Sequence, residues 1–445
     1  MHAMGLADQA VVSGVSFVTT VLISHWTSPS ELGLYAIGVS VLISMVAIQD
    51  SLILLPYTIQ RHQPLSTPHE HAGGTLSHCG LLSAVGLTVL SVIALGLSAR
   101  GSRPELTAMA WALAGVAPFA LLRDFARRFS FAHLHMARAL ILDIAVAAIQ
   151  LVALCWLGWT GKMSPVNAYI AIGGACALTG VVWLYFARTN FVVRVDQVPA
   201  TMKQSWRLGK WLFALQITVS VQAWIPYWLL ALGAGTTATG VYAACMSIVL
   251  FANPLMIGIG NTLAPKAALA LKEGGYARLR REVIQDSLLL CAAMALFCLA
   301  IVFAGEDVMA LLYHGKEYAG HGQTVLVLAL ALLASALGMP PTNALQAMER
   351  PQAIVWASSV GAIVTVILVW CLMIQWGLLG AAYGFLAGNV AGAVGRWIAF
   401  LTLVPRRGPH SAPEADPAIG RARRIERLGS TKRMCSSKAV VGRSS

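Results

Sequence analysis

Charged residues are scarce in this sequence. Asp, Glu, Lys and Arg make up 11% of the 445 residues and hydrophobic residues 58%, whereas soluble domains carry about 25% charged residues. The sequence also lacks a CxxC pair among its eight cysteines, and it lacks a Gly-rich phosphate loop ending in Lys-Ser or Lys-Thr. These absences exclude a soluble domain and disfavour disulfides, zinc and ATP hydrolysis. We therefore expect no cofactor, no metal site and no enzymatic activity.

What the sequence has instead is a series of apolar runs of about 20 residues, the length that crosses a bilayer. Hydropathy, with Pro, Gly and charge clusters as boundaries, predicts an all-α, polytopic membrane protein with twelve membrane-spanning helices. The expected spans are 8–26, 32–58, 76–98, 105–122, 137–159, 165–187, 208–232, 240–262, 285–304, 323–346, 353–374 and 379–404.

The basic residues are divided unequally between the two sets of loops. One set holds sixteen Lys and Arg residues between Arg61 and Arg350, and the opposite set holds only Arg100, Arg103, Lys162 and Lys316. The positive-inside rule therefore predicts that both termini are cytoplasmic. Because the net charge of +13 follows the loops and the end of the chain, it indicates contact with membrane lipids and not with nucleic acid.

An internal repeat divides the chain into two halves of six spans. Shifting the sequence by 207 positions aligns Gln9-x-x-Val12-Ser13 with Gln216-x-x-Val219-Ser220, and Gly33-x-Tyr35-Ala36 with Gly240-x-Tyr242-Ala243. Since each half has an even number of spans, the halves enter the membrane with the same orientation. Parallel repeats around a central cleft are typical of secondary transporters. The predicted organisation is a six-helix repeat at 1–190, a cytoplasmic linker at 191–207, a second repeat at 208–404 and a basic, disordered cytoplasmic tail at 405–445.

Four stretches carry a family resemblance: Asp8-Gln9-Ala10-Val11-Val12-Ser13-Gly14, Thr27-Ser28-Pro29-Ser30-Glu31-Leu32-Gly33-Leu34-Tyr35-Ala36, the motif from Gln49-Asp50 to Pro56-Tyr57-Thr58, and Arg123-Asp124-Phe125-Ala126-Arg127-Arg128. They resemble the polysaccharide transporter (Wzx-like flippase) branch of the multidrug/oligosaccharidyl-lipid/polysaccharide exporter superfamily. The twelve-span layout extends this resemblance over nearly the whole chain apart from the tail.

The resemblance implies a protein of the bacterial inner membrane. Members of this branch are thought to flip polyprenyl-diphosphate-linked oligosaccharides across that membrane by alternating access, in exopolysaccharide, capsule or O-antigen biosynthesis. The implied partners are the lipid-linked oligosaccharide itself, together with a polymerase and other polysaccharide-assembly proteins.

Polar residues on the first span and on its repeat partner are candidates for the substrate path. Residues spaced by three or four positions share one face of a helix, and a lipid-facing helix gains nothing from a polar face. The alternative is helix packing, because Ser and Thr allow close approach and can bond their own backbone. The candidates on the first span are Gln9, Ser13, Ser16, Thr20 and Ser24, and those on the seventh are Gln216, Ser220 and Tyr227.

Charged residues within the spans are further candidates, because a charge at mid-bilayer costs about 2.5–3.5 kcal/mol on insertion scales. Asp50, with its neighbour Gln49, and Arg396 are assigned to the substrate path. Arg396 can alternatively snorkel to the membrane surface. Asp143 lies near an inner helix end, where it can instead cap or pair locally.

Three arginines after the fourth span, Arg123, Arg127 and Arg128, are candidates for receiving a diphosphate head group, which guanidinium groups bind bidentately. The alternative is a topological role with an Asp124–Arg128 pair along the helix. By contrast, Gly384, Gly388 and Gly392 have the spacing of a close-packing helix face.

Two other functions compete with flipping. One is cation-coupled multidrug export by the same superfamily; the absence of acidic residues between Gln197 and Lys272, and between Arg350 and Pro413, disfavours it. Asp50 or Asp143 in the first half would still allow proton coupling. The other is a non-transporting membrane scaffold for a polysaccharide assembly complex.

Overall fold

The computed structural model describes residues 2–60, 68–101, 103–192, 198–313 and 317–404. The tail expected at 405–445 lies outside these residues. Met1–Phe400 form one compact unit, and Leu401–Ser445 form a second. Of the second unit, the structure describes residues 401–404. The described residues form helices and no strand, which confirms the all-α class.

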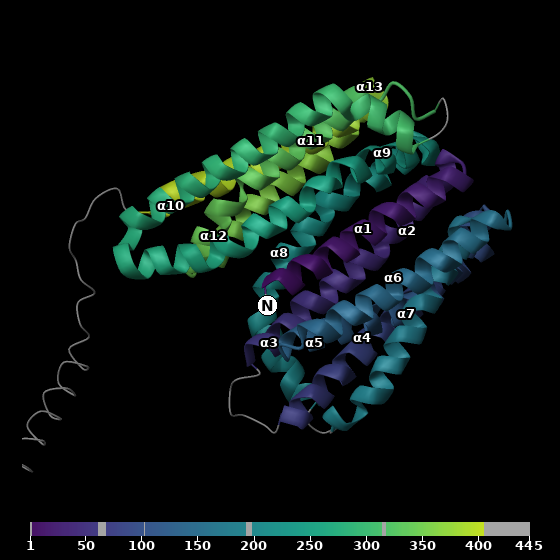
Figure 1. Cartoon of the computed structure of the whole chain (residues 1–445), viewed down its shortest axis with the longest axis horizontal. Helices are drawn as coiled ribbons and strands as arrows, with labels where there is room; N and C mark the ends of the chain where they lie inside the picture. Colours follow the sequence, from purple (N-terminus) through teal and green to yellow (C-terminus); the bar gives the residue numbers. More distant parts are fainter. Residues whose placement is uncertain (1, 61–67, 102, 193–197, 314–316, 405–445) are drawn as a thin grey trace, which may run out of the picture. The chain divides into compact units, whose positions relative to one another are not determined.

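The first half of the chain forms one helical bundle (Figure 1). Its elements are α1 (His2–Trp26), α2 (Pro29–Gln49), a π-helix η1 (Asp50–Leu54), α3 (Leu55–Gln60), α4 (Pro68–Ala99), α5 (Pro104–Ala132), α6 (Met136–Trp159), α7 (Pro165–Ala187) and a 3₁₀ turn η2 (Arg188–Asn190). We call these helices the first bundle.

The second half forms a second bundle beside the first (Figure 1). Its elements are α8 (Val198–Gly233), α9 (Gly235–Val249), a 3₁₀ turn η4 (Leu250–Ala252), α10 (Asn253–Leu312), α11 (Gly322–Leu337), α12 (Met339–Ala347) and α13 (Pro351–Leu403). Because α8 begins at Val198, the part of the expected linker from 198 to 207 is helical.

Helix starts follow the local sequence. Pro29, Pro104 and Pro165 occupy the first turn of α2, α5 and α7, where a missing N–H costs nothing. At α2 the Ser28 hydroxyl accepts from the Glu31 backbone N–H while the Glu31 carboxylate accepts from the Ser28 N–H, a capping box. The expected outer turn before residue 32 is therefore already the first turn of α2.

Ten helical stretches of the described residues are long and apolar enough to cross a membrane. Two of them, Gly235–Leu312 and Pro351–Leu403, exceed by far the roughly 20 residues of one crossing. Each is interrupted by a glycine with positive φ, Gly275 (φ 60°) and Gly377 (φ 57°), a conformation that other residues rarely adopt. Twelve spans thus remain a prediction, with which these two breaks are compatible.

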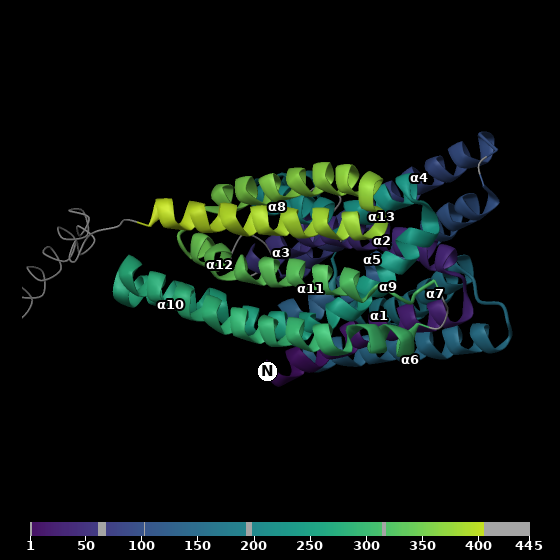
Figure 2. The ribbon, with the colours of Figure 1, turned by 90° about the horizontal axis from the view of Figure 1, so that it is seen from above.

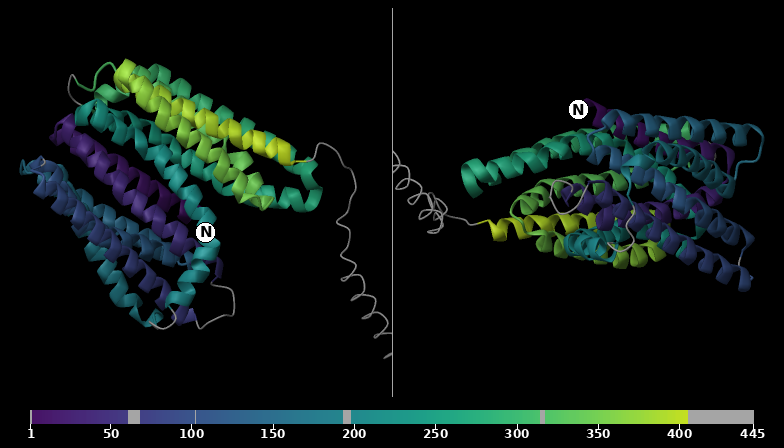
Figure 3. Two further views of the ribbon diagram at one scale, coloured as in Figure 1. Left: turned by 180° about the vertical axis from the view of Figure 1, so that it is seen from behind. Right: turned by 90° about the horizontal axis from the view of Figure 1, so that it is seen from below.

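The break at Gly377 turns α13 back on itself. The backbone of Gly384 lies against Val369, and that of Gly388 against Thr365 and Gly361, with no room for a side chain between them. The two arms lie side by side in the second bundle (Figures 2 and 3). The glycine face predicted from the four-residue spacing is therefore a packing face.

The two bundles meet where α2 and α9 cross. A side chain at Gly33 would strike the backbone of Thr236 and Gly240, and one at Gly240 would strike Pro29 and Gly33. The Ser30 and Thr236 hydroxyls share a 2.5 Å hydrogen bond beside this contact. We call these residues the Gly33–Gly240 contact. Gly33 and Gly240 are the same position of the internal repeat.

Candidate functional site

The last turns of α5 carry arginines on one face. Arg123 and Arg127 are four residues apart, so both side chains reach Asp143 on the neighbouring helix α6. The Arg127 Nε donates to Asp143 Oδ2 over 2.7 Å, and the Arg123 Nη2 donates to Oδ1. The Asp143 side chain is 0% exposed. Asp143 therefore does not cap its own helix but holds two guanidinium groups of another.

Arg127 also reaches the first helix. Its Nη2 donates to Asp8 Oδ2 of α1 over 2.5 Å. One guanidinium group thus binds two carboxylates, and it connects α1, α5 and α6 in the interior of the first bundle.

The third arginine points elsewhere. Arg128 pairs with Asp50 at the start of η1, and their side chains are 46% and 26% exposed. Pro56 favours the π-helical turn before it, because it has no N–H to donate and its ring would strike the carbonyl of Leu52 in a regular helix. The pair expected along α5 between Asp124 and Arg128 is replaced by this bond between α5 and η1.

Among the side chains that the structure describes, the charges of this cluster do not balance. Four aspartates, Asp8, Asp50, Asp124 and Asp143, lie with three described arginines. Two carboxylate oxygens, Asp8 Oδ1 and Asp124 Oδ2, are buried without a hydrogen-bond partner. Because an unpaired buried anion is costly, one further positive charge is needed to make the cluster neutral.

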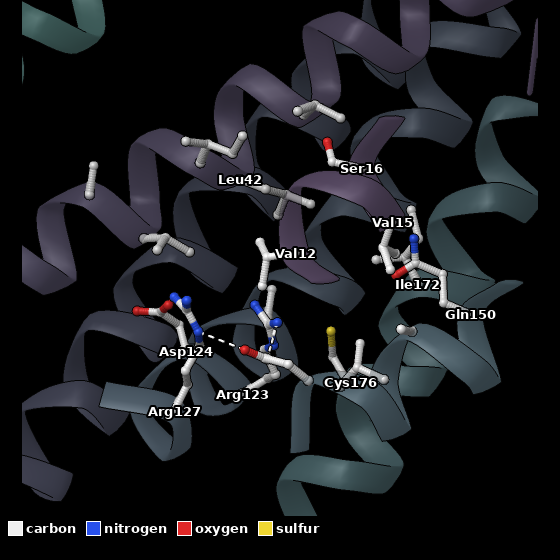
Figure 4. A pocket seen from close by; sticks show the side chains of 18 of the residues that line it. Val12, Val15, Ser16, Leu42, Arg123, Asp124, Arg127, Gln150, Ile172 and Cys176 are labelled. Carbon is white, nitrogen blue, oxygen red and sulfur yellow. Dashed lines mark hydrogen bonds and ion pairs between the residues drawn. The ribbon is translucent and has the colours of Figure 1, made fainter. Parts of the chain in front are cut away.

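The cluster lies at one end of a pocket of about 530 Å³, which we call the charged pocket (Figure 4). Ser16 and Gln150 line it farther from the arginines, and Gln216 of α8 lines it from the second bundle. Gln150 is fixed there by donating to the Thr19 hydroxyl over 2.7 Å. The pocket can therefore hold a cation or a polar group beside ordered charges.

A second pocket, of about 490 Å³, lies between the bundles. It has α1 on one side and α8, α9, η4, α10 and α13 on the other, and we call it the aromatic pocket. All its described lining residues are uncharged, and its rings are Phe17, Trp224, Tyr227, Phe251 and Phe385. Val12, Ser16 and Ile43 line both pockets, so the two are neighbours.

The structure brings most of the predicted site residues to these pockets. Those at the charged pocket are Ser16, Asp50, Arg123, Arg127, Arg128 and Gln216. Those at the aromatic pocket are Ser13, Ser16, Thr20 and Tyr227. Ser220 lines a smaller pocket with Gln216, to which it is hydrogen-bonded.

Four predicted residues lie outside the linings of these pockets. Gln9 bonds Ser13, and Ser24 donates to the Val21 carbonyl of its own helix. The buried Gln49 donates to the Leu121 carbonyl of α5. The first two contacts lie within α1, and only the third joins two helices. Arg396 lies in the second bundle.

Several residues of the site were not singled out from the sequence. Asp8 appeared only within a motif, and Thr19, Asp124 and Gln150 had no assigned role in transport. Acidic residues number only 18 in the chain, so any that falls within or at the end of an apolar run is a signal. That signal identifies Asp8 and Asp124, but nothing in the sequence shows that Asp8 and Asp143 share one arginine.

No protein-family model matches the sequence, and no curated protein matches it either. Solved structures do match the fold. A multidrug resistance MATE family transporter of the MOP superfamily in its inward-facing conformation has a TM-score of 0.73 and 15% identity, covering 88% of this chain and 93% of that one. The outward-facing conformation of a MATE family transporter gives 0.64 at 14% identity, covering 90% and 93%.

A third structure, a MOP superfamily transporter from Pyrococcus furiosus, has a TM-score of 0.66 and 13% identity, covering 90% and 93%. It is described as having a binding pocket of reverse polarity, which suggests a different function. The chain therefore has the fold of MOP superfamily membrane transporters and is a multi-pass membrane protein. The Wzx-like branch within that superfamily stays a prediction.

Proposed function

We propose that this protein is a cation-coupled exporter that works by alternating access. The observation that carries the proposal is the cluster of four aspartates and three arginines at the charged pocket. The sequence disfavours cation coupling because five of the six expected spans of the second half, all but 285–304, contain no carboxylate. The cluster removes that objection, since all four carboxylates lie together in the first bundle.

Coupling would use the unbalanced charge of the cluster. A proton or Na⁺ at Asp8 or Asp124 neutralises the excess negative charge and stabilises the oxygens that have no donor. A cation at Asp8 also competes with Arg127 for the carboxylate and so loosens the bond between α1 and α5. Because α1 lines both pockets, its movement would change the shape of the aromatic pocket.

The cargo would occupy the aromatic pocket. A pocket of about 490 Å³ falls within the range of small-molecule sites, about 300–1,000 Å³. Its rings and the Ser13, Ser16 and Thr20 hydroxyls favour an amphipathic organic molecule. Both matched MATE conformations belong to multidrug resistance transporters, which is consistent with such cargo.

The Gly33–Gly240 contact would close the cleft on one side. The higher TM-score with the inward-facing conformation, 0.73 against 0.64, supports closure on the outer side. That assignment agrees with the charge bias of the loops, which puts the arginine end of α5 and both termini in the cytoplasm.

Flipping of a lipid-linked oligosaccharide in the bacterial inner membrane is the second candidate function. The polar face of α1 favours it, because Ser13, Ser16 and Thr20 offer hydroxyls to a sugar across an uncharged pocket. The three arginines favour it less as head-group ligands, since each already holds a carboxylate. In this case the polymerase and other assembly proteins would be its partners.

The two functions are separated in proteoliposomes. With an imposed pH or Na⁺ gradient, the exporter accumulates ethidium, and D8N and D124N reduce gradient-driven uptake at least tenfold. The same vesicles are then loaded with a fluorescent polyprenyl-diphosphate sugar whose outer-leaflet label is quenched by dithionite. Flipping of this lipid without ethidium uptake under either gradient would replace the exporter by the flippase. If the vesicles show neither activity, the non-transporting scaffold is the remaining function.

A further inference from the structure

Arg396 has no counter-ion among the described residues. It lies on the second arm of α13, and its one hydrogen bond runs from Nε to the Gly392 carbonyl over 3.1 Å. Neither Nη atom has an acceptor among the described residues, and no ion pair to a described carboxylate involves Arg396. The helices packed beside it, α11 and α12, contain no acidic residue, and neither does α13.

The direction of Arg396 argues against snorkelling. Arg396 lies about two turns before the end of α13 at Leu403, which is the nearer end of this arm. Its bond to Gly392 instead holds the side chain toward Gly377, farther from that end. Contact with the near membrane surface would require the opposite course.

Glycine shapes the slot that holds the guanidinium group. The group fills the space that a side chain at Gly338, between α11 and α12, would need, and Gly392 lies on its other side. The neighbouring Trp397 donates its indole N–H to the Leu337 carbonyl over 2.9 Å and fixes the register of α13 against α11. The guanidinium group of the half-buried Arg396 therefore packs against glycine backbone, and its Nη donors have no acceptor among the described residues.

We propose that Arg396 is the centre of an anion site in the second bundle that binds a phosphate group. A partly buried cation needs a partner, and the flat, forked guanidinium group binds phosphate oxygens bidentately. The phosphate belongs either to a membrane lipid head group or to a soluble phosphorylated molecule. The site is independent of the carboxylate cluster, which lies in the first bundle.

Binding is measured on the purified full chain in an uncharged detergent, without any transport assay. Inorganic pyrophosphate is titrated by calorimetry, and native mass spectrometry counts phosphatidylglycerol against phosphatidylcholine. We expect R396Q to weaken binding of the preferred anion at least tenfold, which is about 1.4 kcal/mol. R396K keeps the charge but not the fork, and it should lose less.

Gly338→Ala provides a second test that keeps the arginine. Its Cβ displaces the guanidinium group, so G338A should weaken binding as R396Q does, whereas V394A, at an exposed position of the same arm, should bind normally. If binding of pyrophosphate depends on Arg396 and Gly338, the ligand is a soluble phosphate. If only binding of phosphatidylglycerol depends on them, the ligand is a lipid head group. Equal binding by wild type, R396Q and G338A, or binding by none, overturns the site. Should R396Q not remain monodisperse, G338A decides. Because no ion gradient is involved, loss of coupled transport leaves this result unaffected.

Discussion

The backbone of Gly33 in α2 touches the backbone of Gly240 in α9, and the two glycines occupy equivalent positions of the internal repeat. The duplication thus brings one close-packing position against its own copy. A symmetric contact of this kind joins the two bundles directly at one end of the cleft.

Widening this contact should release the closed end. We expect G33A or G240A to lower the population closed at Ser30–Thr236 and to reduce transport at least fivefold, because a methyl group would strike backbone. Gly80→Ala in α4 is the control, since nothing lies near its Cβ position. In a cysteine-free background, crosslinking of S30C with T236C measures closure. Unchanged crosslinking in both glycine variants would show that the contact does not form the closed end.

Removing the carboxylate shared by two arginines should destabilise the first bundle. Asp143→Asn leaves Arg123 and Arg127 partly uncompensated in a buried site, and we expect a loss of about 3 kcal/mol in unfolding free energy. Asp50→Asn is the matched control, because its half-exposed pair with Arg128 contributes at most about 1 kcal/mol. Unfolding in SDS measures the unfolding free energy of both variants. Equal losses in D143N and D50N would contradict the burial of Asp143.

A bulky side chain where the two pockets join should block transport without unfolding. Ser16 lines both pockets, so we expect S16W to reduce transport below a tenth of wild type while the melting temperature stays within a few degrees. Val18→Trp on the exposed side of the same helix should transport normally. Full activity of S16W would mean that cargo does not pass this junction.

The arms of α13 should tolerate no added volume. A methyl group at Gly384 would strike the backbone of Val369, so G384A should lower the melting temperature by several degrees. Gly96→Ala in α4, where the Cβ position is open, should leave stability unchanged or raise it, by up to about 1 kcal/mol. Equal melting temperatures would argue against close packing of the arms.

The sequence predicted the fold because hydropathy and charge bias act over whole helices. The Gly384–Gly388–Gly392 face was also predictable, since its spacing alone implies close packing. The site was predicted less completely. Arg123 and Arg127 were found, but their partners Asp143 and Asp8 come from two other helices, and no local pattern encodes which helices adjoin. The π-helical turn at Asp50, which redirects this carboxylate toward Arg128, depends on Pro56 and on packing against α5.

The turn at Gly377 has a consequence for how the protein is made. A single glycine separates the two arms of α13, so the ribosome delivers both arms with no soluble segment between them. The first arm alone would leave its close-packing face at Gly361 and Thr365, which the second arm covers, against lipid. The arms should therefore leave the insertion machinery together, as one preassembled hairpin. A chain truncated between them should be recognised by quality-control proteases.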